Sequence, residues 1–207
     1  MAAKDVKPTR SELQEISKKI KLSQNGHKLL KMKRDGLILE FFKILGEARN
    51  VRSELDAAYA AATEKAVLAA AVNGTIGLQS VSFAVDAVPT IELNSTNIMG
   101  VVVPKIKGED VHKQVYNRGY GVVGTDAYID ETAEAYEILV EKIIIAAELE
   151  TTMKRLLDDI EKTKRRVNAL EFKVIPELGE SVRFIKLRLE EMERESITSL
   201  KKIKRKA

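Results

Sequence analysis

Residues 13–62 read LQEISKKIKLSQNGHKLLKMKRDGLILEFFKILGEARNVRSELDAAYAAA, and this stretch decides the fold. A stripe drawn through it in alternating steps of three and four residues is apolar at twelve of its fifteen positions. The stripe comprises Leu13, Ile16, Ile20, Ser23, His27, Leu30, Arg34, Leu37, Phe41, Ile44, Ala48, Val51, Leu55, Ala58 and Ala62. A heptad pattern sustained over this length predicts a coiled-coil helix rather than a helix of a globular domain.

The first helix is expected to extend beyond this stripe at both ends. Thr9, with Glu12 three residues later, resembles a capping box, and Pro8 precedes it. No further proline occurs before Pro89. We therefore expect a first coiled-coil helix within residues 1–72, running from about residue 9 to about residue 72 and roughly 95 Å long at 1.5 Å per residue.

A second coiled-coil helix is expected within residues 125–207, beginning near Thr125 or Asp126, either of which could cap it. Its stripe comprises Ile129, Ala133, Tyr136, Val140, Ile143, Ala147, Met153, Leu156, Ile160, Val167, Leu170, Val174, Leu178, Val182, Ile185, Leu189 and Met192. The step of eleven residues between Val174 and Ile185 departs from the heptad, and Pro176 and Gly179 both disfavour a helix interior. We expect a break near Pro176–Gly179 and then helix to about residue 204.

The residues between the two helices, 73–124, have a different composition, with seven of the eleven glycines and two of the four prolines. Val81–Val85 alternates weakly as a strand, and Ile98–Ile106 is rich in β-branched residues, with Pro104 typical of an edge strand. Asn94–Asn97 is expected to form a turn. These features predict a small β-hairpin insert.

Two long helices that flank a short insert bury both of their apolar stripes when they fold back on each other. The predicted fold is therefore mainly α: a long antiparallel two-helix coiled coil with a small β-hairpin insert between the helices. Joining the helix ends near residues 72 and 128 makes the numbers of facing residues add up to about 200, which places Leu30 near Leu170.

The net charge of +4 is unevenly distributed, with +7 in residues 1–34, +5 in residues 201–207 and −8 between them. The last cluster consists of Lys201, Lys202, Lys204, Arg205 and Lys206. Antiparallel pairing is expected to bring both basic ends to one tip, where self-repulsion favours an enclosing partner.

Several chemistries lack their sequence requirements. The absence of cysteine excludes a disulfide framework, a cysteine zinc site and a thiol nucleophile. We find no signal peptide and no apolar run long enough to cross a bilayer, so membrane contact is expected only through partners. Gly119–Gly124 matches G-x-G-x-x-G without the buried strand that a dinucleotide site requires, no glycine precedes a lysine, and the two histidines lack acidic neighbours at ligand spacing. No catalytic residue, metal site or cofactor is expected.

Ser23, His27 and Arg34 interrupt the apolar seam of the first helix. One interpretation is that His27 packs as a satisfied ring while Arg34 extends to solvent. The other is that this end of the seam is loosened for a partner. His27 and Arg34 are therefore candidate interface residues, together with the five terminal cations.

Several segments resemble the D subunit of the V-type and A-type rotary ATPases. Arg166-Val167-Asn168-Ala169-Leu170-Glu171 with Val174-Ile175-Pro176, and Leu189–Glu195, are similar to that family's C-terminal helix. Pro8–Ser11 and Gly26–Asp35 resemble its first helix, and Asn97–Val101 its middle insert. The resemblance spans nearly the whole chain in the right order. The chain ends soon after Lys206, without the long tail expected of many eukaryotic members, which favours an archaeal A-type complex.

The resemblance implies a non-catalytic central rotor shaft that couples proton or sodium flow to ATP synthesis or hydrolysis by rotation. It implies that the helix termini lie inside a ring of catalytic A and B subunits and that a small F subunit binds along the stalk. The insert would face the C subunit and the membrane ring, with Ile98, Val101 and Val103 as candidate interface residues. The expected location is peripheral, on the cytoplasmic face of the cell membrane, without direct nucleic-acid contact.

Two alternatives come from other classes of protein. A basic coiled-coil nucleic-acid-binding protein would explain both termini and would bind with a steep salt dependence, but the charge is expected at a tip rather than along a face. A prefoldin-like chaperone also joins two helices through β-hairpins, but its clamp requires apolar helix tips, whereas these are basic.

Overall fold

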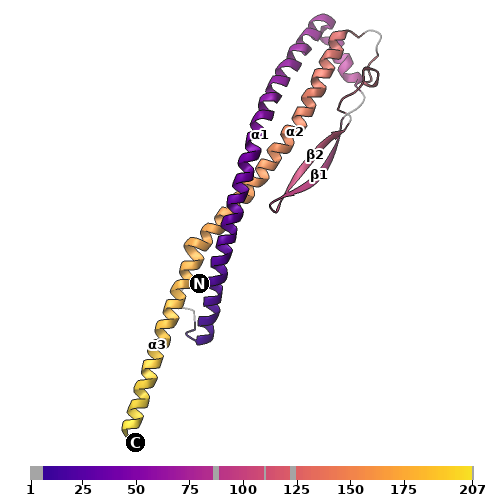
Figure 1. Cartoon of the computed structure of the whole chain (residues 1–207). Coiled ribbons are helices and arrows are strands. Elements are labelled where there is room, and N and C mark those ends of the chain that lie inside the picture. The colour runs from indigo at the N-terminus through magenta and orange to yellow at the C-terminus, as the bar shows by residue number, and fades with distance from the viewer. Residues whose placement is uncertain (1–6, 86–88, 110, 122–124, 207) are drawn as a thin grey trace. The chain divides into compact units, whose positions relative to one another are not determined.

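A computed structural model describes residues 7–85, 89–109, 111–121 and 125–206. The chain divides into two compact units. The terminal unit contains described residues 7–37 and 160–206, and the central unit contains those between 38 and 159. Two long helical segments and a small antiparallel β-hairpin between them make up the chain, which confirms the predicted fold class (Figure 1).

Helix α1 runs from Arg10 to Ala84. The backbone N–H of Glu12 donates to Oγ1 of Thr9 at 3.2 Å, which confirms Thr9 as the N-cap. Every stripe position from Leu13 to Ala62 is buried or half-buried, so the heptad prediction is confirmed.

The end of α1 lies beyond the expected boundary near residue 72. Val81 and Phe83 are helical, so the strand predicted there is wrong. An alternation this short does not separate a strand from the last turn of a helix. Gly74 interrupts the helical geometry with φ 75° and ψ 157°, a conformation that is essentially restricted to glycine.

The second helical segment consists of α2 (Ala127–Ala169), a π-helical turn η3 (Leu170–Val174) and α3 (Ile175–Lys206). The irregularity predicted near Pro176–Gly179 therefore lies immediately before Pro176, and Gly179 is helical. Pro176 has no N–H to donate to the preceding turn, and a widened π turn accommodates such an interruption without ending the helix.

The insert contains β1 (Thr90–Ile98) and β2 (Val101–Glu109), which pair antiparallel, followed by the short 3-10 helix η2 (Val115–Asn117). The hairpin prediction is confirmed, and Pro104 lies on an edge because both strands of a two-stranded sheet are edges. The turn predicted at Asn94–Asn97 is wrong, because these residues belong to β1. Met99 and Gly100 form the turn, with φ of 50° and 89°.

Contacts within each unit establish the antiparallel register. In the central unit, Ala62, Ala135 and Leu139 form a buried cluster against which Leu55 and Ala58 pack. Ion pairs join α1 to the second helical segment in both units: Arg52 with Glu150, Glu54 with Lys142, His27 with Glu171 and Arg10 with Glu193. The residue numbers of each pair add up to about 200, which confirms the predicted register.

The first half of α2 buries two faces rather than the single stripe expected. Tyr136, Ile143 and Ala147 of the predicted stripe are exposed. The buried residues that replace them toward α1 include Ala135 and Leu139. The hairpin covers a second face of α2, and a single averaged stripe cannot describe two faces.

One described helix, α1, contains an 18-residue window with a mean hydropathy of 1.4. Only 6% of this window is buried. By length and composition alone this window could cross a membrane. The sequence prediction required an apolar run without interruption, and polar residues interrupt the apolar run of α1. The mean hydropathy of the window includes these polar residues in its average. The helix therefore passes the test of mean hydropathy but not the test of an unbroken apolar run.

Candidate interface sites

The C-terminal part of α3 extends beyond the first residue of α1. Nη2 of Arg10 donates to Oε1 of Glu193 at 2.6 Å, and α3 continues to Lys206. The remaining residues, 194–206, span about 20 Å at 1.5 Å per residue; we call them the C-terminal overhang. Among the described residues, the basic start of α1 therefore does not coincide with the terminal cations at one tip as expected, because Arg10 lies opposite Glu193.

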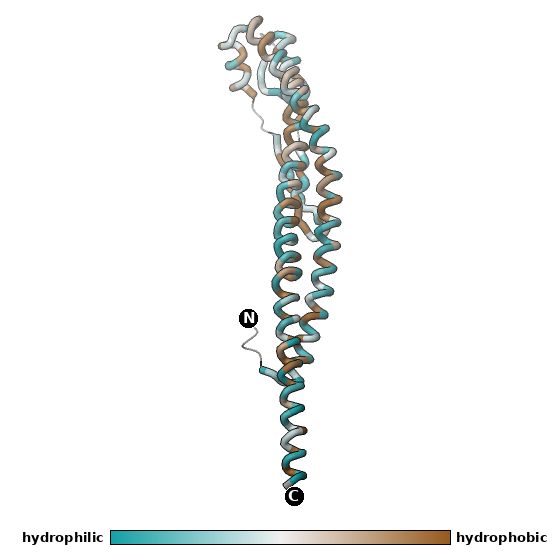
Figure 2. The backbone as a smooth tube through the Cα atoms, turned by 90° about the vertical axis from the view of Figure 1, so that its left-hand side faces the viewer, coloured by the Kyte–Doolittle hydropathy of each residue, from teal (hydrophilic) through white to brown (hydrophobic). Residues whose placement is uncertain are grey.

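The C-terminal overhang contains both hydrophobic and hydrophilic residues along its length (Figure 2), and its described side chains are exposed. Ile197, Leu200 and Ile203 recur at every third position and are 53%, 65% and 64% exposed. Lys201, Lys202, Lys204 and Arg205 are exposed between and beside them, and Lys206 ends the helix with a side chain outside the described set. This combination fits a partner surface that offers apolar contacts and acidic groups.

His27 and Arg34 contact groups of their own chain. Nε2 of His27 lies 3.3 Å from Oε2 of Glu171, which belongs to the π-helical turn η3, and the side chain of His27 is 20% exposed. Arg34 donates through Nε and Nη2 to Oδ1 of its neighbour Asp35. Their assignment to a partner interface stays a prediction.

The hairpin packs on α2 through part of β2. Val101 and Val103 are buried, whereas Val102 is 54% exposed and Ile98 is half-buried. Nη1 of Arg155 donates to the carbonyl of Val102 at 2.8 Å. Ile98, Val101 and Val103 stay predicted interface residues, and the side chains of Val101 and Val103 are enclosed by this chain.

A buried cation that the sequence did not reveal, Arg118, ties the loop before α2 to that helix. Its side chain is 8% exposed and donates through Nε to Oε1 of Glu137 at 2.9 Å and through Nη2 to Oε2 at 3.2 Å. Nη1 of Arg118 lies 3.5 Å from the hydroxyl of Tyr120, which itself donates to Oδ1 of Asp130 at 2.6 Å. We call these four residues the Arg118 cluster.

The environment of the Arg118 cluster stabilises the protonated form of both Arg118 and Tyr120. Burial raises the pKa of the Tyr120 hydroxyl, and its hydrogen bond to Asp130 raises it further. Burial is the largest single effect on Arg118 and would lower its pKa, but the hydrogen bonds and charge interactions with Glu137 and Tyr120 together outweigh burial and raise it. At neutral pH Arg118 is therefore a cation and Tyr120 a neutral phenol.

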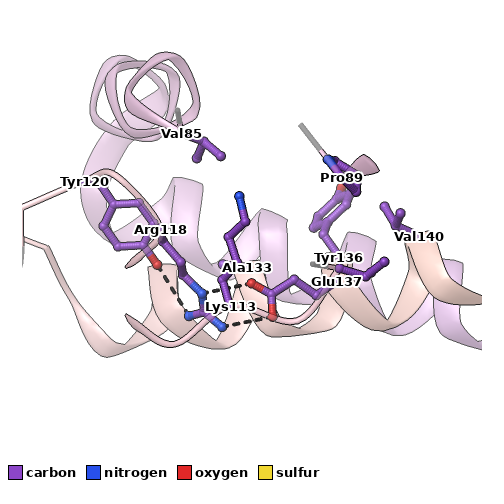
Figure 3. A pocket seen from close by; sticks show the side chains of 10 residues that line it. Val85, Pro89, Lys113, Arg118, Tyr120, Ala133, Tyr136, Glu137 and Val140 are labelled. Carbon is purple, nitrogen blue, oxygen red and sulfur yellow. Dashed lines mark hydrogen bonds and ion pairs between the residues drawn. The ribbon is translucent and has the colours of Figure 1, made fainter. Parts of the chain in front are cut away.

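A pocket of about 220 Å³ lies beside the Arg118 cluster (Figure 3). Its walls are mostly apolar and include Val85, Pro89, Ala133 and Val140, with Arg118 and Glu137 bonded to each other at one side. No serine or histidine is among the described residues that line it. The arrangement is suited to holding the insert against α2.

Possible metal and nucleotide sites can be located only among the residues that the structure describes. Among those residues, no group of three or more histidine or acidic side chains could hold a metal ion. Of the G-x-G-x-x-G segment, Gly119 has a φ of 89°, and residues 122–124 lie outside the described ranges. His112 lies near Glu137 and Glu141, at 3.6 Å and 3.3 Å, although these residues are distant in sequence.

The fold is that of a two-helix coiled-coil protein with a β-hairpin insert between the helices. A family model that describes the D subunit of ATP synthase matches residues 12–205. The chain belongs to this family of ATP synthase D subunits.

Curated relatives agree over nearly the whole chain. The chain is 69% identical over 204 residues to the D subunit of the A-type ATP synthase of Methanosarcina mazei, covering 99% of this chain and 98% of that protein. It is 67% identical to the D subunit of the A-type ATP synthase of Methanococcoides burtonii, covering 99% and 100%. The identity to the corresponding D subunit of Haloarcula marismortui is 52%, covering 99% and 89%.

Proposed function

We propose that this chain is the central rotor shaft of an archaeal A-type ATP synthase and contributes no catalytic residue of its own. The C-terminal overhang turns inside the ring of A and B subunits, so that rotation couples proton or sodium flow to ATP synthesis or hydrolysis. A small F subunit binds along the stalk, and the insert faces the C subunit and the membrane ring. The chain is thus peripheral to the membrane, on its cytoplasmic face.

The observation that carries this proposal is the exposure of the C-terminal overhang. A single helix with Ile197, Leu200 and Ile203 in solvent loses the stabilisation that burial of these side chains would provide. Enclosure by a surrounding ring would supply this burial. The cations beside them would form exposed ion pairs with the ring worth about 0–1 kcal/mol each, and such weak contacts exchange readily as the shaft turns.

A reversible covalent tether tests the rotation. In an ATP synthase assembled with this cysteine-free chain, Ser199→Cys is paired with a cysteine on the facing surface of the catalytic ring. Oxidation should stop multi-turnover ATP hydrolysis, and reduction should restore it without loss of subunits. The matched control, Ser199→Cys without the ring cysteine, should hydrolyse ATP at an unchanged rate under the same oxidant.

A second tether removes the one escape from this test. The helix end could swivel about backbone bonds near the π-helical turn Leu170–Val174 while Ser199→Cys stays tethered. A cysteine at Glu161, an exposed position on the other side of that turn, excludes this motion. Undiminished hydrolysis by complexes that are fully crosslinked at both positions would overturn the rotor assignment.

A further inference from the structure

The turn of the hairpin determines which backbone groups of each strand point outward. Met99 and Gly100 both have positive φ, the geometry of a two-residue hairpin turn. In such a turn the flanking residues, Ile98 and Val101, exchange hydrogen bonds, and alternate pairs along the ladder direct their N–H and C=O groups away from the partner strand. The outward residues are therefore Val102, Pro104, Ile106 and Gly108 of β2, and Ile91, Leu93, Ser95 and Asn97 of β1.

The outward edge of β2 is occupied. The carbonyl of Val102 accepts from Arg155 at 2.8 Å, and the N–H of Ile106 donates to Oε2 of Glu148 at 2.9 Å, so two side chains of α2 meet its outward groups. Between them, Pro104 has no N–H that would need a partner. This edge is closed to further strand pairing, and these contacts confirm the direction of the ladder.

The outward edge of β1 is open. Every residue of β1 except Ile98 is exposed, and none of its outward N–H or C=O groups has a partner among the described residues. Figure 1 shows β1 on the side of the hairpin away from α2. Folded proteins normally block such an edge with proline, lysine or a covering element, and β1 contains neither residue.

We propose that the open edge of β1 receives an extended strand from another protein of the ATP synthase complex, completing a three-stranded sheet. Main-chain hydrogen bonds to Leu93 and Ser95 would hold this strand. Ile91 and Leu93, 53% and 71% exposed, call for apolar side chains on one of its faces, and Glu92 calls for a cation on the other. This strand pairing rests on membership of the ATP synthase complex but does not require that the chain rotates.

Amide hydrogen exchange at single-residue resolution tests the proposal without any substitution. The chain is compared alone and in an assembled A-type ATP synthase. In the complex, exchange at the outward amides of Leu93 and Ser95 should slow by about tenfold or more. The inward amides of Glu92 and Asn94, which already bond to β2, should change less. Equal exchange at Leu93 and Ser95 in both samples would overturn the proposal.

A pair of substitutions separates the backbone contact from the side chain. Leu93→Pro removes one outward N–H without removing a β1–β2 hydrogen bond, whereas Leu93→Ala keeps the N–H. The proline variant should lose the exchange protection of Ser95 in the complex, and the alanine variant should retain it. Protection that appears in the isolated chain as its concentration rises, together with a dimeric mass, would instead assign the edge to a second copy and overturn the proposal. The disulfide tether at Ser199 tests rotation of the C-terminal overhang, whereas hydrogen exchange tests strand pairing at β1. Either proposal can therefore fail without the other.

Discussion

Arg10 and Glu193 form an ion pair at 2.6 Å although 183 residues separate them in the sequence. Both side chains are more than half exposed, at 79% and 58%, so the pair contributes little to stability. The ion pair instead identifies which turn of α3 lies beside the start of α1. The buried side chains of the seam, including Ile16 and Ile185, provide the stabilisation that holds this register.

The register predicts which engineered cysteines form disulfides. Leu30→Cys should oxidise with a cysteine at Leu170 or within one heptad of it, because a disulfide requires Cα atoms within about 7 Å. Non-reducing electrophoresis and peptide mapping measure the product. Leu30→Cys combined with Tyr136→Cys serves as the control and should stay reduced; efficient crosslinking of that pair would contradict the antiparallel register.

The Arg118 cluster should respond differently to single and double substitutions. Arg118→Met leaves the carboxylate of Glu137, whose side chain is 15% exposed, without its cation, and the free energy of unfolding should fall by about 3–5 kcal/mol. Adding Glu137→Leu removes the unpaired charge and should recover most of this loss. Urea unfolding followed by circular dichroism measures both. Equal losses in the single and double variants would show that the ion pair is not the source of the effect.

Tyr120 should make the stability of the chain sensitive to alkaline pH. Because the pKa of Tyr120 is raised in the folded chain, the folded state holds this proton more tightly than the unfolded state. The stability that the Tyr120 proton contributes is fully present below the ordinary tyrosine pKa of about 10, and it is lost as the pH rises above that value. Tyr120→Phe should be less stable at pH 8 and should show a shallower decline between about pH 9 and 11. Parallel curves for the two proteins would contradict this assignment.

Gly108 of β2 lies against Ile144 of α2 with little room for a Cβ. A Cβ at this position would lie 2.7 Å from Cδ1 of Ile144 and 3.0 Å from Cγ2 of Val111. Gly108→Ala should therefore lower the free energy of unfolding by about 1–3 kcal/mol through overpacking. Ile144→Val removes the Cδ1 methyl and should restore part of the loss in the double variant. Additive losses measured by urea unfolding would show that the two residues do not meet.

The cations of the C-terminal overhang should act together rather than singly. Neutralising any one of Lys201, Lys202, Lys204, Arg205 or Lys206 should change ATP turnover little, since exposed ion pairs contribute about 0–1 kcal/mol each. Removing all five should weaken assembly of the complex and reduce the dependence of assembly on salt. Native mass spectrometry across a salt series measures this effect. A single substitution with the full effect would point to one dominant ion pair.

The long seam of α1 was predictable because its pattern repeats many times. Each stripe position adds independent support, and even His27 and Arg34 lie on the half-buried face. The hairpin was less certain because short segments carry little periodic information. Val81 and Phe83 alternate like a strand within a helix, and the polar run at Asn94–Asn97 resembles a turn within a strand.

The Arg118 cluster was not predictable from the sequence. Arg118 and Glu137 are 19 residues apart on different elements, and no spacing rule connects them. The glycine-rich segment that begins at Gly119 matches a phosphate-loop pattern without the strand that such a loop requires, and it gives no sign of a salt bridge. Pairings of this kind depend on how the loop returns to α2, and that path is set by tertiary packing.

The π-helical turn at Leu170–Val174 sets the rotational phase of everything that follows it. It inserts one residue into the winding of the helix, and one residue of an α-helix corresponds to about 100° of rotation. If the same residues followed regular α-helical winding, the extra residue would rotate Ser181 and Ile185, both buried, by about 100° away from the seam. Deleting one residue here should therefore restore regular winding and leave both residues facing the seam. The π-helical turn thus corrects the rotation of α3 about its own axis, so that the buried face of α3 continues the buried face of α2.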